Sequence, residues 1–314
     1  MSLVIKRIKG KKYYYSFLSY FLKDKPKSFS RYIGPQKPSV GESLKIENSF
    51  KDELIQKISG KAYTSLLVSK DDVIRCLLFR DLFQRKYQKL PPLKRRKYDI
   101  DSTVRFTLTT LTTEEVEVDL TDVENALKKS SGLTQKERIS KNMLDAIELI
   151  KEGHKLDKNY ILRLHRMIMA GFGSKAPGKF RGKQVYLYRK GAFGSLDRLE
   201  LSYRPPDYKK IEGMLNEFLD WYNDSTLNPI EKASMAHNNL YKIHPFLDGN
   251  KRVCRLIFNK TLLDNGFPLI NVSVNKETYF DVIVASVEKN DPRPFVDFVL
   301  KQYYKQVREF LAAK

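Results

Sequence analysis

The stretch that decides the fold reads HNNLYKIHPFLDGNKRVCRLIFNK and spans residues 237–260. A helical pattern ends at His244, a tight turn follows over residues 246–250, and a second helix opens at Lys251 with Asn250 as its expected N-cap. A loop of this kind presents backbone N–H groups at a helix N-terminus, where unpaired donors and the helix dipole favour an anion. The stretch therefore predicts an anion site between two helices.

The side chains of this loop indicate which anion it would take. Gly249 lets a phosphate approach the backbone closely. Arg252 and Arg255 lie three residues apart on one helix face, so both guanidinium groups can reach the same polyphosphate. Asp248 is placed to hold Mg²⁺ beside those phosphates. His244, at the mouth of the loop, is the candidate general base.

These residues resemble the signature of the Fic family, HxFx(D/E)GN(G/K)RxxR. The matching positions are His244, Phe246, Asp248, Gly249, Asn250, Arg252 and Arg255. Phe246 faces away from the phosphate side in such a turn and is expected to anchor the loop in the core. The resemblance covers about residues 137–312.

A hairpin upstream of the loop extends the resemblance. Two β-prone runs, Gln184–Tyr188 and Leu199–Tyr203, flank a turn at Gly191–Gly194. This hairpin resembles the flap of Fic proteins. By analogy, the flap strand at Val185, Tyr186 and Leu187 would align a target segment through main-chain pairing.

The resemblance implies a mainly α fold: a Fic-type helical core with the β-hairpin flap. It implies a protein adenylyltransferase that transfers AMP from ATP to a Tyr, Ser or Thr hydroxyl of a target protein. His244 would deprotonate that hydroxyl, and Asp248 would bind Mg²⁺. The amides of Gly249, Asn250 and Lys251 would cradle the phosphates. Arg252 would neutralise the leaving pyrophosphate, and Arg255 would reach the γ-phosphate.

Position 251 departs from most adenylylating members, which have Gly there. Lys251 resembles the Doc-type branch, whose chemistry is phosphorylation of a protein. An extra cation could turn the nucleotide around, so that the γ-phosphate faces His244. A Doc-like phosphotransferase is therefore kept as the alternative activity.

A second departure concerns the inhibitory helix of many Fic proteins, (S/T)xxxE(G/N), whose Glu pairs with the second arginine of the motif. No Glu-Gly or Glu-Asn pair occurs in the segment 103–115, where that helix is expected. The segment 43–48 (SLKIEN) fits the pattern, but it lies about 200 residues before His244 and is interpreted as a coincidence. We therefore expect Arg255 to be unpaired and the enzyme to be constitutively competent.

The excess of positive charge leaves nucleic-acid binding open as a different class of function. The 314 residues carry a net charge of +21, and residues 1–97 contribute +16 of it. Basic and aromatic residues interleave over residues 3–35, a pattern that could stack bases but more often forms a half-buried sheet with lysines outward. Solvated surface charge is favoured here, with a nucleic-acid-binding regulator as an open alternative.

The cysteine spacing and the lengths of the apolar runs indicate the expected cellular location. Cys76 and Cys254 match no disulfide or zinc spacing, which favours a reducing, cytoplasmic location. No apolar run is long enough to cross a membrane, and the N-terminus does not have a signal-peptide layout. The oligomeric state stays open, with a homodimer among the alternatives.

Three domains are expected along the chain. Residues 1–36 form a basic antiparallel hairpin or meander, residues 37–136 a helical region that includes a basic linker at 85–97, and residues 137–314 the Fic catalytic domain.

The Thr-rich stretch 101–116 is β-leaning. Two further histidines are interpreted as supporting residues: His165 as a packing residue, and His237 as a residue behind the site.

Overall fold

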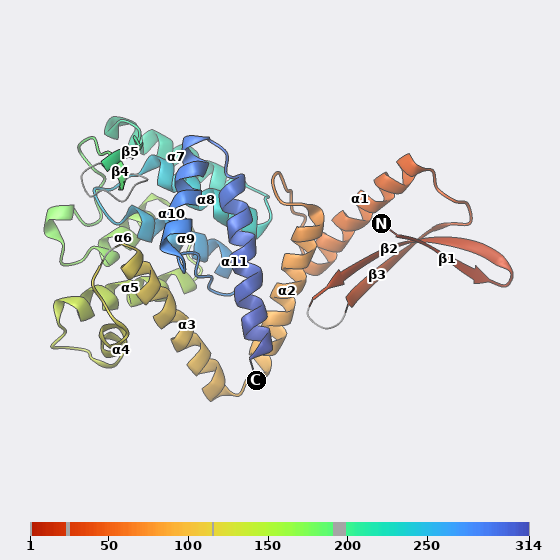
Figure 1. Ribbon diagram of the computed structural model, residues 1–314, viewed down its shortest axis with the longest axis horizontal. Coiled ribbons are helices and arrows are strands. Elements are labelled where there is room, and N and C mark those ends of the chain that lie inside the picture. Colours follow the sequence, from red (N-terminus) through yellow and green to blue (C-terminus); the bar gives the residue numbers. More distant parts are fainter. Residues whose placement is uncertain (1, 23–25, 115, 191–198, 314) are drawn as a thin grey trace. The chain divides into compact units, whose positions relative to one another are not determined.

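A computed structural model of the chain describes residues 2–22, 26–114, 116–190 and 199–313 (Figure 1). It confirms the mainly α fold with a β-hairpin inserted between helices. In chain order the elements are β1 (Ser2–Ile8), β2 (Lys11–Phe21), β3 (Pro26–Gly34), α1 (Val40–Ser59), α2 (Lys70–Lys89), α3 (Pro92–Thr113), α4 (Leu120–Lys128), α5 (Gln135–Lys151), α6 (Lys158–Ile168), the 3₁₀ turn η1 (Gly173–Lys175), β4 (Leu187–Lys190), β5 (Leu199–Tyr203), the 3₁₀ turn η2 (Tyr208–Lys210), α7 (Ile211–Asp224), α8 (Pro229–Ile243), α9 (Asn250–Leu263), α10 (Lys276–Glu288) and α11 (Arg293–Ala312).

The chain forms two compact units. The first comprises residues 1–86, 226–228 and 307–314, and the second comprises residues 87–225 and 229–306. The first unit contains an antiparallel sheet of order β1-β2-β3, so the expected N-terminal β-structure is a three-stranded meander. Its β2 strand buries Leu18 and Tyr20 on one face, and the Tyr20 hydroxyl donates to Asp71 at the start of α2.

Helix α9 is the central element of the second unit. Its apolar side chains Val253, Leu256, Ile257 and Phe258 are all fully buried. Polar side chains of α9, such as Arg255, Asn259 and Thr261, are buried as well, and α9 contacts α3, α5, α6 and α8. The candidate loop joins α8 to this buried helix, so the packing of the core fixes the position of the loop.

The β-leaning interpretation of residues 101–116 is wrong, because this stretch lies almost entirely in helix α3. The hydroxyls of Thr109, Thr112 and Thr113 donate to carbonyls four residues earlier, which satisfies them inside a helix. Val104 and Leu108 also lie at helical spacing and pack in one apolar cluster with residues of α4 and α5. Tertiary packing therefore overrides the β-propensity of threonine.

The basic segment 85–97, expected as a linker, is helical except at residues 90–91. Pro91 precedes the first residue of α3, and Pro92 occupies that first position, where a missing N–H costs no hydrogen bond. The proline pair therefore separates two helices that follow each other directly.

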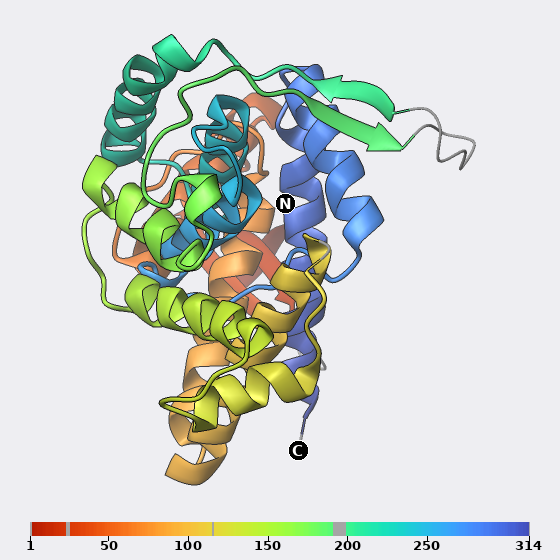
Figure 2. The ribbon, with the colours of Figure 1, turned by 90° about the vertical axis from the view of Figure 1, so that its left-hand side faces the viewer.

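The hairpin upstream of the loop is present, but its first strand is shorter than expected. Strand β4 begins at Leu187, whereas Val185 and Tyr186 precede it. It pairs with β5 in an antiparallel register in which Leu187 faces Tyr203, and Figure 2 shows the two strands side by side. The turn expected at 191–194 lies outside the described residues.

None of the helices in the described part of the chain combines the length and the apolar character needed to cross a bilayer.

The apolar cluster beneath α3 yields a test of this fold. Leu144 of α5 is 3% exposed and packs against Val104, Val123 and Ala126. We expect Leu144→Ala to lower the free energy of unfolding by about 2–5 kcal/mol, because it removes buried methyl groups and leaves a cavity. Urea unfolding followed by circular dichroism measures this loss. Leu93→Ala on α3 makes the same change at an 82% exposed side chain and should alter stability by less than about 0.5 kcal/mol; equal losses would contradict the assignment.

Candidate active site

The turn between α8 and α9 is closed by a single side chain. The Asn250 amide accepts a hydrogen bond from the Phe246 N–H and donates one to the Phe246 carbonyl, both at 2.9 Å. Helix α9 begins at Asn250 with Gly249 as its N-cap, so the expected N-cap role of Asn250 is wrong. Because Asn250 bonds back to the turn, no side chain from the described residues caps the first amides of α9. Those amides keep their capacity to bind an anion.

The underside of the loop rests on α6. Phe246 is fully buried and stacks on the His165 ring at 3.7 Å, which confirms Phe246 as the anchor of the loop and His165 as a packing residue. The Gly178 N–H donates to His165 Nδ1, so Nε2 carries the proton and donates to the Asp248 carbonyl at 3.0 Å. Gly249 has a φ of +76°, and an added Cβ would lie 2.9 Å from Met169 Sδ. The glycine is therefore required by the backbone and by this packing.

Arg181, which no sequence motif singled out, holds the loop from the flap side. This buried guanidinium donates to the carbonyls of His244 (2.8 Å), Lys183 (3.1 Å) and Pro206 (2.6 Å), and the Arg181 N–H donates to the Pro245 carbonyl. It therefore ties the loop to the residues on both sides of the flap. In the sequence, Arg181 stands in the stretch 177–185 (PGKFRGKQV), directly before the flap.

His244 is 6% exposed and adopts a φ of 49°, in the left-handed region. Its Nδ1 lies 3.3 Å from the Tyr241 carbonyl, which can only accept, so Nδ1 carries the proton and Nε2 keeps its lone pair. Burial lowers the pKa of His244 to about 4, helped by the positive charges of Lys251 and Arg181. The imidazole is therefore neutral at neutral pH, as a general base must be.

Asp248 lies at the mouth of the turn with 39% of its side chain exposed. One carboxylate oxygen accepts from the Gly249 N–H at 2.6 Å and lies 3.5 Å from the Arg252 guanidinium. The other oxygen lies 3.8 Å from Lys175 Nζ, beyond hydrogen-bond distance. One carboxylate with an available oxygen suits Mg²⁺, which proteins often hold through one or two carboxylates together with substrate phosphates.

Arg252 keeps an unused donor inside the protein. Its side chain is 5% exposed, and its Nε is buried without a hydrogen-bond partner among the described residues. A buried donor without a partner is costly, and an anion at the loop would supply the acceptor.

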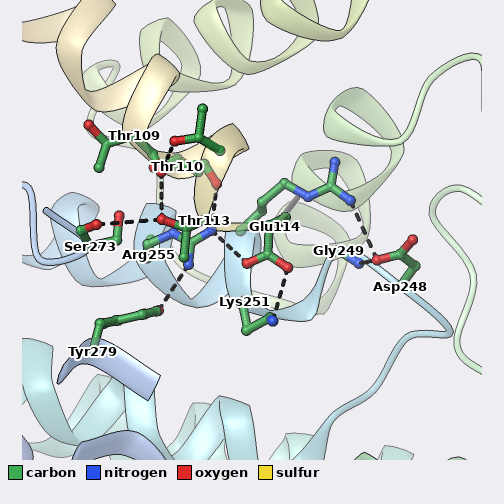
Figure 3. Close-up of polar contacts among 12 residues, drawn as sticks. Thr109, Thr110, Thr113, Glu114, Asp248, Gly249, Lys251, Arg255, Ser273 and Tyr279 are labelled. Atoms are coloured by element: carbon green, nitrogen blue, oxygen red, sulfur yellow. Dashed lines mark hydrogen bonds and ion pairs between the residues drawn. The ribbon is translucent and has the colours of Figure 1, made fainter. Parts of the chain in front are cut away.

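Arg255 is not unpaired, so the expectation of a free second arginine is wrong (Figure 3). Its guanidinium is fully buried and donates to the carboxylate of Glu114 at 2.9 Å. It also donates to the Thr110 carbonyl and to the Tyr279 hydroxyl, each at 3.1 Å. The Thr110 carbonyl belongs to the last turn of α3, where carbonyls lack partners within the helix.

Glu114 joins two cations of the motif. Its second oxygen lies 3.3 Å from Lys251 Nζ (Figure 3). The same ammonium stands 4.1 Å above the Phe280 ring. Burial would raise the pKa of Glu114, but the positive charges of Lys251, Arg255 and Arg252 outweigh it and hold the pKa below its usual value. The carboxylate is therefore ionised and bridges Arg255 and Lys251.

The sequence contained a signal for Glu114. Thr110 and Glu114 have the spacing of the inhibitory pattern (S/T)xxxE, but Glu115 follows where the pattern requires Gly or Asn. A β-strand would not place Glu114 at the end of a helix, whereas the structure has Glu114 as the C-cap residue of α3. The alternative match places Glu47 in α1, where it pairs with Lys51 at 2.7 Å.

His237 lies behind Arg255, as expected. Its Nε2 is 2.9 Å from the Tyr279 hydroxyl, and burial, with the charge of Arg255, lowers its pKa to about 3. The neutral Nε2 accepts a hydrogen bond from the Tyr279 hydroxyl, which leaves the tyrosine oxygen to accept one from Arg255. This chain of hydrogen bonds fixes the orientation of the guanidinium.

Comparison with known proteins agrees with this geometry. The Fic/DOC family model matches residues 155–262. The protein adenylyltransferase fic-1 of Caenorhabditis briggsae is 33% identical over 170 residues, which cover 52% of this chain and 31% of that protein. The protein adenylyltransferase Fic of Nematostella vectensis is 27% identical over 168 residues, covering 52% and 36%. The chain thus spans about a third of the length of the curated relatives it matches.

The fold is shared with solved structures as well. A Fic family protein from Desulfovibrio desulfuricans G20 superposes with a TM-score of 0.63 at 20% identity, over 80% of this chain and 77% of that one. The family match includes the whole loop from His244 to Arg255. Residues 155–262 of this chain are therefore similar to the Fic/DOC family.

Proposed function

We propose that the protein is a protein adenylyltransferase that transfers AMP from ATP to a hydroxyl side chain of a target protein. The observation that carries the proposal is one loop that joins a neutral, buried imidazole (His244), a carboxylate (Asp248) and an arginine with an unused buried donor (Arg252). Anion-binding groups held beside a base suit phosphoryl-type chemistry, which depends on positioning and charge stabilisation.

In the proposed reaction, His244 Nε2 accepts the proton of the target hydroxyl. The hydroxyl oxygen forms a bond to the α-phosphorus, the bond from that phosphorus to the β-phosphate bridge oxygen breaks, and pyrophosphate leaves. Arg252 offsets the charge on the leaving group, and the first amides of α9 hold the phosphates. Asp248 would hold Mg²⁺, which would neutralise phosphate charge when bound. Arg255 would bind the γ-phosphate.

The flap is the proposed docking element for the target. Tyr186, 45% exposed, precedes β4, and β4 pairs with β5 alone among the described strands. We propose that this strand, with Val185 and Leu187 beside Tyr186, aligns an extended target segment by main-chain pairing.

Glu114 is the proposed brake on this reaction. The Glu114 carboxylate occupies the Arg255 guanidinium, which the γ-phosphate would otherwise contact. The ion pair with Lys251 further stabilises the carboxylate in this position. We propose that ATP binds productively only when the carboxylate leaves, so that basal activity is low.

Labelling distinguishes the proposed reaction from its alternative. Incubation with Mg²⁺ and ATP labelled at the α-phosphate should transfer label to the protein itself or to a protein of a cell lysate, and His244→Ala should reduce transfer at least about 100-fold, the contribution expected of a general base. Asp248→Asn and Arg252→Ala should also weaken it. Label appearing only from γ-labelled ATP would contradict AMP transfer and favour the Doc-like phosphotransferase, for which Lys251, an extra cation that shares Glu114 with Arg255, gives a specific reason.

The brake is tested by ATP affinity. Glu114→Ala should bind ATP at least about tenfold more tightly in calorimetry, which corresponds to about 1.4 kcal/mol. Without ATP the same variant should unfold at a lower temperature, because Arg255 loses the counter-charge for its buried guanidinium.

Two variants serve as controls for the brake. Glu114→Gln keeps the size of the side chain and should show the same gain in affinity. Glu117→Ala removes an exposed carboxylate three residues away and should leave ATP affinity unchanged. Unchanged affinity in both Glu114 variants would contradict the brake but not the transferase.

The protonation state of His244 can be followed directly. Between pH 8 and pH 5.5 we expect its ring NMR signals, assigned by their loss in His244→Asn, to stay at neutral positions. They should move only as the pH falls toward about 4, because burial disfavours the imidazolium. A titration midpoint near the ordinary value of about 6.5 would contradict a buried, neutral base.

A further inference from the structure

The β1–β3 sheet has two different faces. On the inner face, Ser16 and Tyr20 are buried, and Arg31 binds Ser49 and Glu53 of α1 at 3.2 and 3.0 Å. Alternate residues of a strand point to opposite sides, so residues 13 and 15 of β2 belong to the other face. The inner face thus packs on helices of its own unit, beside which the strands run in Figure 1.

The opposite face carries aromatic rings and cations. We call it the tyrosine face and define it by Lys6, Lys11, Tyr13, Tyr15 and Tyr32. The Tyr32 ring lies 5.4 Å from Tyr15 and 6.1 Å from Tyr13, and the Lys6 ammonium stands 4.5 Å above the Tyr15 ring. Tyr32 is 51% exposed, and Lys6 and Lys11 are exposed. The rings therefore form a partly open platform with ammonium groups beside it.

The charge around this face has one sign. The three strands contain no acidic residue. By strand pairing, Lys6 and Lys11 lie on the tyrosine face, whereas Arg7, Lys12, Lys27 and Arg31 lie on the inner face. Such a surface complements a polyanion. The proposed reaction uses none of these residues.

We propose that the tyrosine face binds single-stranded nucleic acid. Cations alone would suit any polyanion, including an acidic protein, but a cluster of partly exposed rings beside them suits unpaired bases, which stack on aromatic side chains while lysines contact the phosphates. A duplex hides the faces of its bases, so a single strand fits this platform better.

Fluorescence anisotropy with a labelled oligothymidylate of twelve nucleotides tests the proposal on the full chain. Binding should be measurable at 50 mM salt and should weaken steeply toward 200 mM. Tyr32→Thr keeps a good strand former at the position and should weaken binding about 5- to 100-fold through lost stacking. Tyr208→Thr makes the same change at a 36% exposed tyrosine outside the sheet and should have no effect.

A second variant probes the phosphate contacts independently of the rings. Lys6→Glu should weaken binding and lower the steepness of the salt dependence by roughly 0.7 to 1 in the log–log slope per lost contact. Lys128→Glu, at a side chain 72% exposed on α4, should change neither.

Base-free and duplex probes decide what is recognised. An abasic strand of equal length and charge should bind at least about tenfold more weakly than oligothymidylate. Equal binding of the abasic strand, equal binding of a duplex, or no binding at 50 mM salt would each overturn the proposal. The same unfolding temperature in Tyr32→Thr and in the unaltered protein shows that lost binding reflects the surface.

Discussion

A guanidinium buried without water must find its partners inside the protein, and this constraint organises the catalytic unit. Arg255 is fully buried in α9 and meets a carboxylate from the end of α3, a carbonyl from the last turn of that helix and a hydroxyl from α10. Helices α3, α9 and α10 must therefore converge on one side chain. A buried charge is tolerated only when paired and hydrogen-bonded, so these contacts are conditions for the observed packing.

The loop could be predicted from the sequence because its decisive residues are contiguous. His244, Asp248, Gly249 and the two arginines lie within twelve residues, so local spacing carries the geometry. Glu114 could not be found that way, because 141 residues separate it from Arg255. The local preference of its threonine-rich segment also pointed to a strand, whereas packing against α4 and α5 makes it a helix. Arg181 was missed for a similar reason: its acceptors are main-chain carbonyls, which leave no residue pattern.

Lys251 illustrates how one position can take on several roles. Within the signature it is an extra cation. Its resemblance to the Doc-type branch connects it with the opposite orientation of the bound nucleotide. In the folded chain it lies between Glu114 and the ring of Phe280. Lys251 therefore stabilises the same carboxylate that pairs with Arg255. A substitution of Lys251 would change both the position of Glu114 and the positive charge near the phosphates.

The paired hydrogen bonds between the Asn250 amide and the backbone of Phe246 have an entropic consequence. They fold the turn before any ligand arrives, so the chain gives up its conformational freedom during folding and has little left to lose on binding. A ligand then spends its interaction free energy on affinity and alignment. Loosening this turn should consequently reduce the fraction of bound ligand that is correctly aligned, even where total binding is preserved.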